Sequence, residues 1–198
     1  MPYDVFAALV LFVFVTAFTP GPNNIMVTAS GVNFGFMRTV PHMAGITIGF
    51  VVLVVAAAAG LGAIFAAAPA VQTVLKIAGA LYMLWLAWKV ANSRPDNGAK
   101  VDLGKPMTFL QAAAFQWVNP KAVVMALTVI ALYVRPDYRV RDALIVLAVE
   151  VLATVGTVVT WTGFGVALRG LLANPRHART FNIVMALLLV VSIVPMVL

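Results

Sequence analysis

Long apolar segments alternate with short polar ones along the whole sequence. A helix needs about 20 mostly apolar residues to cross a bilayer, and six segments reach that length. We predict membrane-spanning helices over residues 4–36, 40–64, 70–91, 107–133, 141–168 and 178–197. The pattern therefore predicts an all-α integral membrane protein with six transmembrane helices.

The most polar stretch, residues 93–106, divides the chain into two halves of similar length. We treat residues 1–198 as one transmembrane domain, with a first repeat over 1–92 and a second over 107–198. Each half contains three predicted spans, an odd number, so the two repeats must be inverted relative to each other in the membrane. Inverted repeats are typical of secondary transporters, in which discontinuous helices meet near the middle of the bilayer.

The first and fourth predicted spans are interrupted near their middles. The first is about 50 Å long at about 1.5 Å per residue, against a hydrocarbon core of about 30 Å, and it contains Pro20, Gly21 and Pro22. The fourth contains Asn119 followed by Pro120. Each proline removes a backbone donor and disrupts a helix by about 3 kcal/mol or more, so we predict two half-helices in each span.

A kink in a packed helix is the alternative interpretation of each break. One Asn/Pro break in each half of the chain favours a cavity instead. Broken backbone at membrane depth is tolerated only where protein or a water-filled space satisfies its polar groups.

The breaks also carry the candidate chemistry. New helix N-termini offer unpaired N–H groups and a positive dipole end, which favour an anion such as a carboxylate. Asn23, Asn24 and Asn119 add amide groups, and Lys121 adds a positive charge. A lysine in mid-bilayer costs about 2.5–3.5 kcal/mol on insertion scales, so it needs a partner.

Glu150 is the only acidic residue deep inside a predicted span. We expect Lys121 and Glu150 to share a central cavity, where Lys121 holds a substrate carboxylate and Glu150 contacts its ammonium group or exchanges a proton. The alternatives are that Lys121 snorkels to an interface and that Glu150 is a buried structural partner. The predicted substrate-binding residues are Pro20, Gly21, Pro22, Asn23, Asn24, Asn119, Pro120, Lys121 and Glu150. Five further polar residues are more typical of interhelical hydrogen bonds than of a binding site: Gln111, Gln116, Thr154, Thr157 and Asn182.

Composition agrees with this class of protein. The chain is 63% hydrophobic and 10% charged, with a mean hydropathy of +1.04, whereas soluble domains are about 45–50% apolar and about 25% charged. It has no cysteine, so disulfides are excluded. The net charge of +7 resides in short loops, which is a topology signal rather than a nucleic-acid footprint.

Eight Lys and Arg residues follow the first, third and fifth spans against four on the other side, which predicts a cytoplasmic central loop and both termini outside.

Two other classes of membrane protein are alternatives to a transporter. An intramembrane enzyme is disfavoured because the chain has no HExxH, no GxSxG and no paired aspartates at membrane depth. A channel or a structural membrane protein stays open as the alternative, although a channel usually shows rings of polar or charged residues. His42 and His177 lie near span ends without metal-ligand spacing, so neither a metal nor a cofactor is expected.

Several motifs occur here in one combination. They are Phe18-Thr19-Pro20-Gly21-Pro22-Asn23, the glycines Gly31, Gly35, Gly45 and Gly49, the run from Gly79 to Lys89, and Asn119-Pro120-Lys121. Together they resemble the LysE/RhtB family of amino-acid exporters over essentially the whole chain. Three segments are most similar to the cysteine/O-acetylserine exporter branch: Asn23-Asn24-Ile25, Trp85-Leu86-Ala87-Trp88-Lys89 and Asn182-Ile183-Val184.

The resemblance implies export of a small, neutral amino acid or derivative from the cytoplasm, driven by the proton motive force. Close members of the family differ in what they carry, so the resemblance implies a substrate such as cysteine, O-acetylserine, threonine or homoserine without identifying which. It also implies a multi-pass protein of the bacterial inner membrane that works with protons and a lipid bilayer. Whether several copies associate stays open.

Overall fold

The computed structural model describes residues 1–92, 106–191 and 193, apart from the side chains of Pro69 and Gln72. Helices make up the regular structure of these residues, and no strand occurs among them. The α-helices are α1 (Tyr3–Phe18), α2 (Pro22–Phe34), α3 (Phe36–Ala58), α4 (Leu61–Ala67), α5 (Pro69–Ala91), α6 (Phe109–Phe115), α7 (Pro120–Tyr133), α8 (Arg139–Ala167) and α9 (Pro175–Val191). Two short 3₁₀ turns, η1 (Pro136–Tyr138) and η2 (Leu171–Ala173), precede α8 and α9.

Both predicted breaks are present. The axis bends by 52° between α1 and α2 and by 63° between α6 and α7. Pro22 and Pro120 each begin the second half-helix, the position where a missing N–H costs least. The two long predicted spans are therefore pairs of half-helices, as the proline positions indicate.

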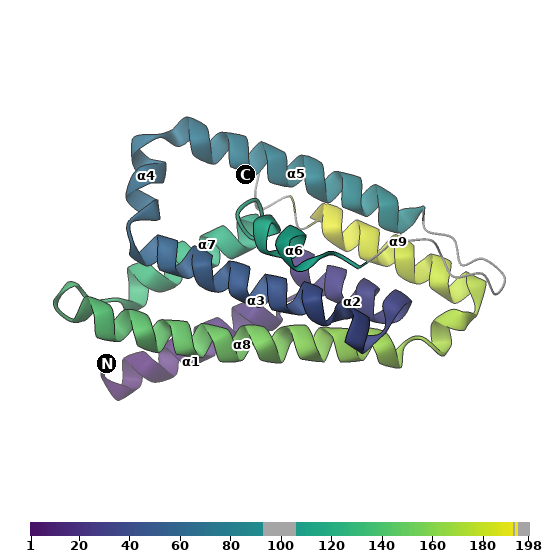
Figure 1. The fold of residues 1–198 in the computed structure, drawn as a ribbon, viewed down its shortest axis with the longest axis horizontal. Helices are drawn as coiled ribbons and strands as arrows, with labels where there is room; N and C mark the ends of the chain where they lie inside the picture. The colour runs from purple at the N-terminus through teal and green to yellow at the C-terminus, as the bar shows by residue number, and fades with distance from the viewer. Residues whose placement is uncertain (93–105, 192, 194–198) are drawn as a thin grey trace.

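The helices run back and forth along one long axis (Figure 1). The α2–α3 turn and the α8–α9 connection lie at one end of the molecule, while the N-terminus and the α7–α8 turn lie at the other. The broken pair α1/α2 packs against α8, and the broken pair α6/α7 packs against α3. Because α5 packs against α9, the main contacts join the two halves of the chain.

Glycines allow the closest of these contacts. A Cβ on Gly31 would lie 2.4 Å from the carbonyl oxygen of Thr162, and one on Gly165 would lie 2.2 Å from that of Thr28. In the same way, a Cβ on Gly45 would lie 2.3 Å from the carbonyl oxygen of Phe109. Small residues at helix crossings let the backbones approach in this way, so α2 meets α8 and α3 meets α6 backbone to backbone.

The second span differs from the prediction at both ends. It begins at Phe36 rather than at 40, because Gly35 adopts a φ of 82° and makes the turn after α2. Pro41 therefore lies inside α3. The span ends at Ala58, because Gly60 adopts a φ of 113° and starts the separate helix α4. Both positive φ values are ones that glycine adopts without strain.

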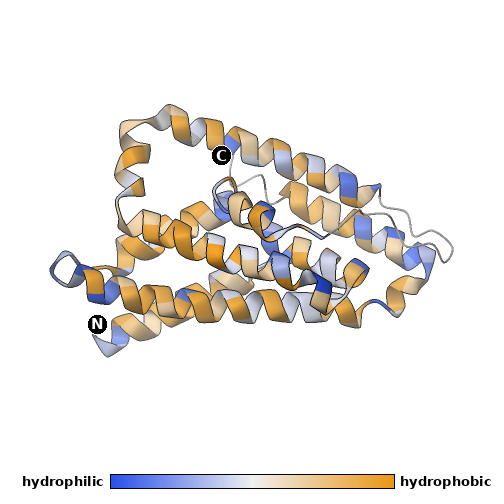
Figure 2. Ribbon diagram, in the orientation of Figure 1, coloured by the Kyte–Doolittle hydropathy of each residue, from blue (hydrophilic) through white to orange (hydrophobic). Residues whose placement is uncertain are grey.

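Three helical segments are long and apolar enough to cross a membrane: Phe36–Ala58, Thr73–Ala91 and Pro136–Ala167. Counting each broken pair as one span raises the number to five within the described residues. The predicted sixth span, 178–197, is described only through α9 and Ile193, so it stays a prediction. The predicted central loop lies almost wholly outside the described residues. Apolar residues dominate the helices, and polar ones gather near the turn between α7 and α8 (Figure 2).

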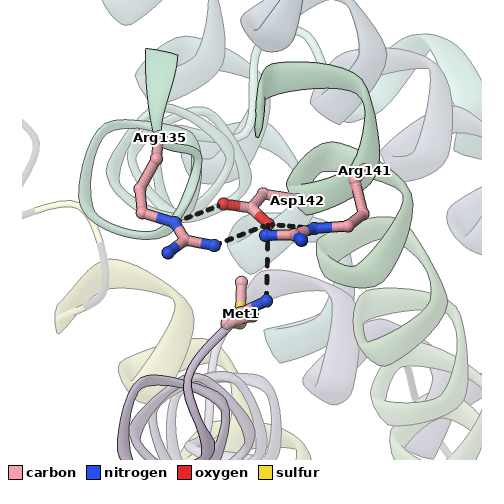
Figure 3. A network of polar contacts seen from close by, with 4 residues as sticks. All are labelled: Met1, Arg135, Arg141 and Asp142. Atoms are coloured by element: carbon pink, nitrogen blue, oxygen red, sulfur yellow. Dashed lines mark hydrogen bonds and ion pairs between the residues drawn. The ribbon is translucent and has the colours of Figure 1, made fainter. Parts of the chain in front are cut away.

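That turn is held by a cluster of charged groups around Asp142 (Figure 3). The Asp142 side chain is fully buried. It accepts hydrogen bonds from Arg135 Nε at 2.7 Å and from Arg141 Nη2 at 3.2 Å. The N-terminal ammonium group lies 3.9 Å from its Oδ1 atom. These contacts tie the start of α8 to the end of α7 and to the segment before α1.

Candidate functional site

The two breaks lie against each other, although they are about a hundred residues apart in the sequence. Lys121, in the first turn of α7, donates a hydrogen bond from Nζ to the carbonyl oxygen of Thr19 at 2.6 Å. Gly21 makes room for this side chain, because a Cβ there would lie 2.9 Å from Lys121 Cδ. The lysine of the second break therefore reaches a backbone oxygen that the first break leaves without a helical partner.

A pair of side-chain amides forms a second bridge between the breaks. Asn23 Nδ2 donates to Gln116 Oε1 at 2.8 Å, and Gln116 Nε2 donates to Asn23 Oδ1 at 3.2 Å. Gln116 is fully buried and also donates to the carbonyl oxygen of Ala112 at 2.9 Å. Its hydrogen-bonding capacity is thus largely satisfied, which suits a group that holds two half-helices in register.

Asn24 satisfies the end of α1. Its Nδ2 atom donates to the carbonyl oxygens of Ala17 at 2.9 Å and of Thr19 at 3.0 Å. These carbonyls belong to the last turn of α1 and its C-cap, where helical donors are missing. Asn24 therefore compensates for the polar cost of the break at membrane depth.

A cavity of about 50 Å³ lies between the two breaks. Residues of both breaks line it, together with Ile46 and Phe50 from α3 and Thr154 and Thr157 from α8. The lining residues from the breaks are Gly21, Pro22, Asn23, Asn24, Asn119 and Lys121. The volume is enough for a few water molecules.

Two polar groups of this lining have no partner among the described residues. They are the Oδ1 atom of Asn119 and the hydroxyl of Thr157, both buried. Asn119 holds the N-cap position of α7, but its side chain makes no cap hydrogen bond. Buried polar atoms are nearly always satisfied, so these groups are available to water or a ligand in the cavity.

Three of the nine predicted site residues lie outside this cavity lining. Pro20 is exposed, and Pro120 lines a different hollow beside α5. Glu150 does not line the cavity either, although Thr154 on the same face of α8 does. Lys121 lines the cavity in this structure and Glu150 does not, so a shared role of the two residues stays a prediction.

Glu150 is 1% exposed, and neither carboxylate oxygen has a hydrogen-bond partner among the described residues. Lys121 is half-buried and directed at the Thr19 carbonyl. Burying a carboxylate without a partner is costly in its charged form. The interpretation of Glu150 as one member of a buried structural pair is not supported either.

The positions of Gln116, Thr154 and Thr157 were not predicted, because such residues are more typical of ordinary interhelical hydrogen bonds. Gln116 does make such a bond, to Asn23, but it does so at the junction of the two breaks. Thr154 and Thr157 line the cavity. Their spacing of three residues, which places both on one helix face, was the signal that could have found them.

The fold and site together define a class: a multi-pass helical membrane protein in which two broken helices meet around a small cavity with polar groups in its lining. The family model named LysE type translocator matches residues 14–194 of the chain. The chain belongs to the LysE family of translocators, as its sequence motifs indicated.

Curated relatives support the same conclusion. The chain is 34% identical over 182 residues to a protein of Escherichia coli (strain K12) named cysteine/O-acetylserine efflux protein, with 90% of each chain covered. Proteins of the same name in Escherichia coli O1:K1 / APEC and in Shigella flexneri serotype 5b (strain 8401) match with the same identity and coverage. No solved structure matches the chain. These relatives are named as efflux proteins and not as enzymes.

Proposed function

We propose that this protein is a secondary transporter of the bacterial inner membrane that exports a small neutral amino acid or derivative from the cytoplasm, driven by the proton motive force. Cysteine and O-acetylserine are the first candidates, because the relatives carry these names. Threonine and homoserine are chemically close alternatives. The observation that carries the proposal is Lys121, a cation held between two helix breaks in a cavity at the centre of the helices.

The proposed carboxylate site consists of Lys121 and the N-termini of α2 and α7. Helix geometry leaves the first N–H groups of α2 and α7 without intrahelical partners, and both helix ends line the cavity. In the structure, Lys121 Nζ donates to the neutral carbonyl oxygen of Thr19. A substrate carboxylate is a stronger acceptor, since charge-assisted hydrogen bonds are roughly twice as strong as neutral ones. The substrate carboxylate would replace the Thr19 carbonyl oxygen as the acceptor of the Lys121 hydrogen bond. This exchange would release the bridge between α7 and the first break.

This exchange also couples binding to a change in shape. A cavity of about 50 Å³ holds only a few waters, whereas an amino acid needs several times that space. The breaks must therefore separate for substrate to bind. The Lys121–Thr19 and Asn23–Gln116 bridges are the contacts that open.

Glu150 is the proposed proton-exchange residue. It lies one helical turn from Thr154, which lines the cavity, and its buried carboxylate has no partner. A group in that setting is more stable neutral than charged. It releases its proton when the rearrangement brings it into contact with water or with the substrate ammonium. The proton that moves inward and the amino acid that moves outward would then bind in turn at the same face of α8.

Six spans in two inverted repeats complete the proposal. In support of it, each broken pair packs against the second span of the other half, and α5 packs against α9. This exchange of partners is what an inverted pair of repeats would produce, with the two breaks at its centre.

Counterflow in liposomes tests the function. Vesicles loaded with unlabelled cysteine, O-acetylserine, threonine or homoserine should accumulate the labelled form of at least one of them with saturable kinetics. Lys121→Ala should abolish this exchange, whereas Lys76→Ala, an exposed lysine on α5, should not. Equal exchange in the two variants would remove Lys121 from the site. Unsaturable flux without exchange would instead identify a channel.

A further inference from the structure

A second and larger cavity lies beside the first break, toward the α2–α3 turn. Its volume is about 250 Å³, against about 50 Å³ for the cavity between the breaks. Residues of α2, α3, α5, α6 and α9 line it. The two cavities have no lining residue in common. The larger one has the room for a small amino acid that the smaller one lacks.

His42 is the unusual residue of this cavity. It is 1% exposed, and neither ring nitrogen has a hydrogen-bond partner within the described part of the chain. One imidazole nitrogen is always a donor, and the other is an acceptor in the neutral ring. A buried polar group without a partner costs about 1–3 kcal/mol, so an unpartnered imidazole on a cavity wall marks a place for a polar ligand.

The charge of the lining identifies the ligand's chemistry. Lys89, in the last turn of α5, is the one formally charged residue among the described lining residues, and no carboxylate accompanies it. Its Nζ atom lies 5.0 Å from the centre of the Trp85 ring, a cation–π contact that holds the ammonium group. Tyr82 and Gln111 also line the cavity. A cation with no acidic neighbour among the described lining residues favours a carboxylate.

The position of the cavity relates it to the breaks. Along α2, Asn23 and Asn24 line the smaller cavity. Five residues further along the same helix line the larger one: Ile25, Met26, Ala29, Ser30 and Phe34. Along α3, Ile46 lines the smaller cavity and His42, one turn earlier, lines the larger one. Both helices therefore place the second cavity nearer the α2–α3 turn, the side predicted to face the cytoplasm.

We propose that the cavity around His42 is a second amino-acid binding site, a loading site that takes a substrate from the cytoplasmic side before it reaches the breaks. Lys89 receives the carboxylate, and His42 supplies a polar contact deeper in the cavity. The assignment of substrate class rests on the proposed function. The site itself rests on the cavity, on the imidazole of His42 and on the cation of Lys89, which has no carboxylate beside it among the described lining residues.

Trp85 provides a direct reporter, because it lines the cavity. In a variant with Trp88, Trp117 and Trp161 replaced by Phe, reconstituted into lipid nanodiscs, the fluorescence of Trp85 should change on adding cysteine, O-acetylserine, threonine or homoserine. The methyl ester of the active amino acid, which lacks the carboxylate, should bind at least tenfold more weakly. The protein has no cysteine, so dithiothreitol can keep added cysteine reduced.

Two substitutions with matched controls test the assigned residues. Lys89→Gln should weaken binding at least tenfold, and Lys76→Gln on the same helix should leave it unchanged. His42→Leu should weaken binding while keeping or raising the temperature of unfolding, because it removes an unpartnered polar group. The control His177→Leu changes an exposed ring. A role of His42 in folding alone would lower the unfolding temperature and leave affinity intact.

The outcomes separate this site from the proposed function. Lys121→Ala should lose counterflow but keep the Trp85 response. A Trp85 response without counterflow in the unsubstituted protein would refute transport and leave the binding site. Counterflow with no Trp85 response to any of the four amino acids, or with equal binding of acid and ester, would overturn the loading site and leave transport intact.

Discussion

Replacing Gly165 by alanine should separate α2 from α8. A Cβ at this position would lie 2.2 Å from the carbonyl oxygen of Thr28 and 3.0 Å from its carbonyl carbon. Ordinary contacts begin near 3.4 Å, so the two backbones must move apart by about 1 Å. Neither contact atom belongs to a flexible side chain, and rotation of a side chain cannot relieve the clash. Overpacking of this kind costs about 1–3 kcal/mol.

Gly163→Ala is the matched control, because a Cβ there meets nothing within 4 Å. Both substitutions gain the same helix propensity, about 1 kcal/mol in favour of alanine, so their difference isolates the helix contact. The free energy of unfolding, measured by denaturation in mixed micelles, should be lower for Gly165→Ala than for Gly163→Ala by about 1–3 kcal/mol. Counterflow should fall with it, since α2 begins at the first break. Equal stability of the two variants would refute the close approach of α2 and α8.

Three further substitutions test other parts of the structure. Glu150→Gln should retain exchange of amino acid at equal pH but lose its response to an imposed pH gradient, measured in liposomes; an unchanged response would exclude Glu150 from proton coupling. Asp142→Asn should lower the temperature of unfolding, because it removes the charge that Arg135 and Arg141 share, and a wild-type melting curve would show that the cluster does not stabilise the start of α8. Pro22→Ala should reduce the rate of counterflow, because it removes the constraint that starts α2 after the 52° bend; a wild-type rate would mean that the bend does not depend on this proline.

Local chemistry accounts for what could be predicted about the fold. Proline lacks a backbone donor wherever it lies, so Pro22 and Pro120 identified the second half-helices without any knowledge of packing. The edges of the second span were missed for a different reason. Gly35 and Gly60 turn the chain through positive φ values, and nothing in the neighbouring residues distinguishes such a glycine from Gly45 or Gly49, which pack inside a helix.

The candidate site was predictable in part. Six of the nine predicted residues line the cavity between the breaks. They were predictable because they lie at the new helix ends, and in the structure those ends meet. Glu150 was assigned to the same cavity from its depth along the chain alone. Depth does not determine where along a helix face a cavity lies: Thr154 and Thr157 line it, and Glu150, one turn away on the same face of α8, does not.

His42 shows the opposite error. Its sequence neighbours give no metal-ligand spacing, and it lies near a predicted span end, so the sequence offered no role for it. Burial and the lack of a partner for either nitrogen are properties of the packed molecule. They arise only when α2, α5, α6 and α9 assemble beside α3.

By itself, the sequence determined which segments are long and apolar enough to cross a membrane, where they break and which polar residues accompany the breaks, because run length, proline and composition act locally. Only the tertiary structure decided which of these groups meet. Lys121 reaches the carbonyl of Thr19, 102 residues away, and Asn23 pairs with Gln116, 93 residues away. Contacts between such distant segments depend on helix packing, which here rests on glycine contacts between backbones. The spacing of Gly45 and Gly49 is typical of close packing, but it does not say which helix lies against them.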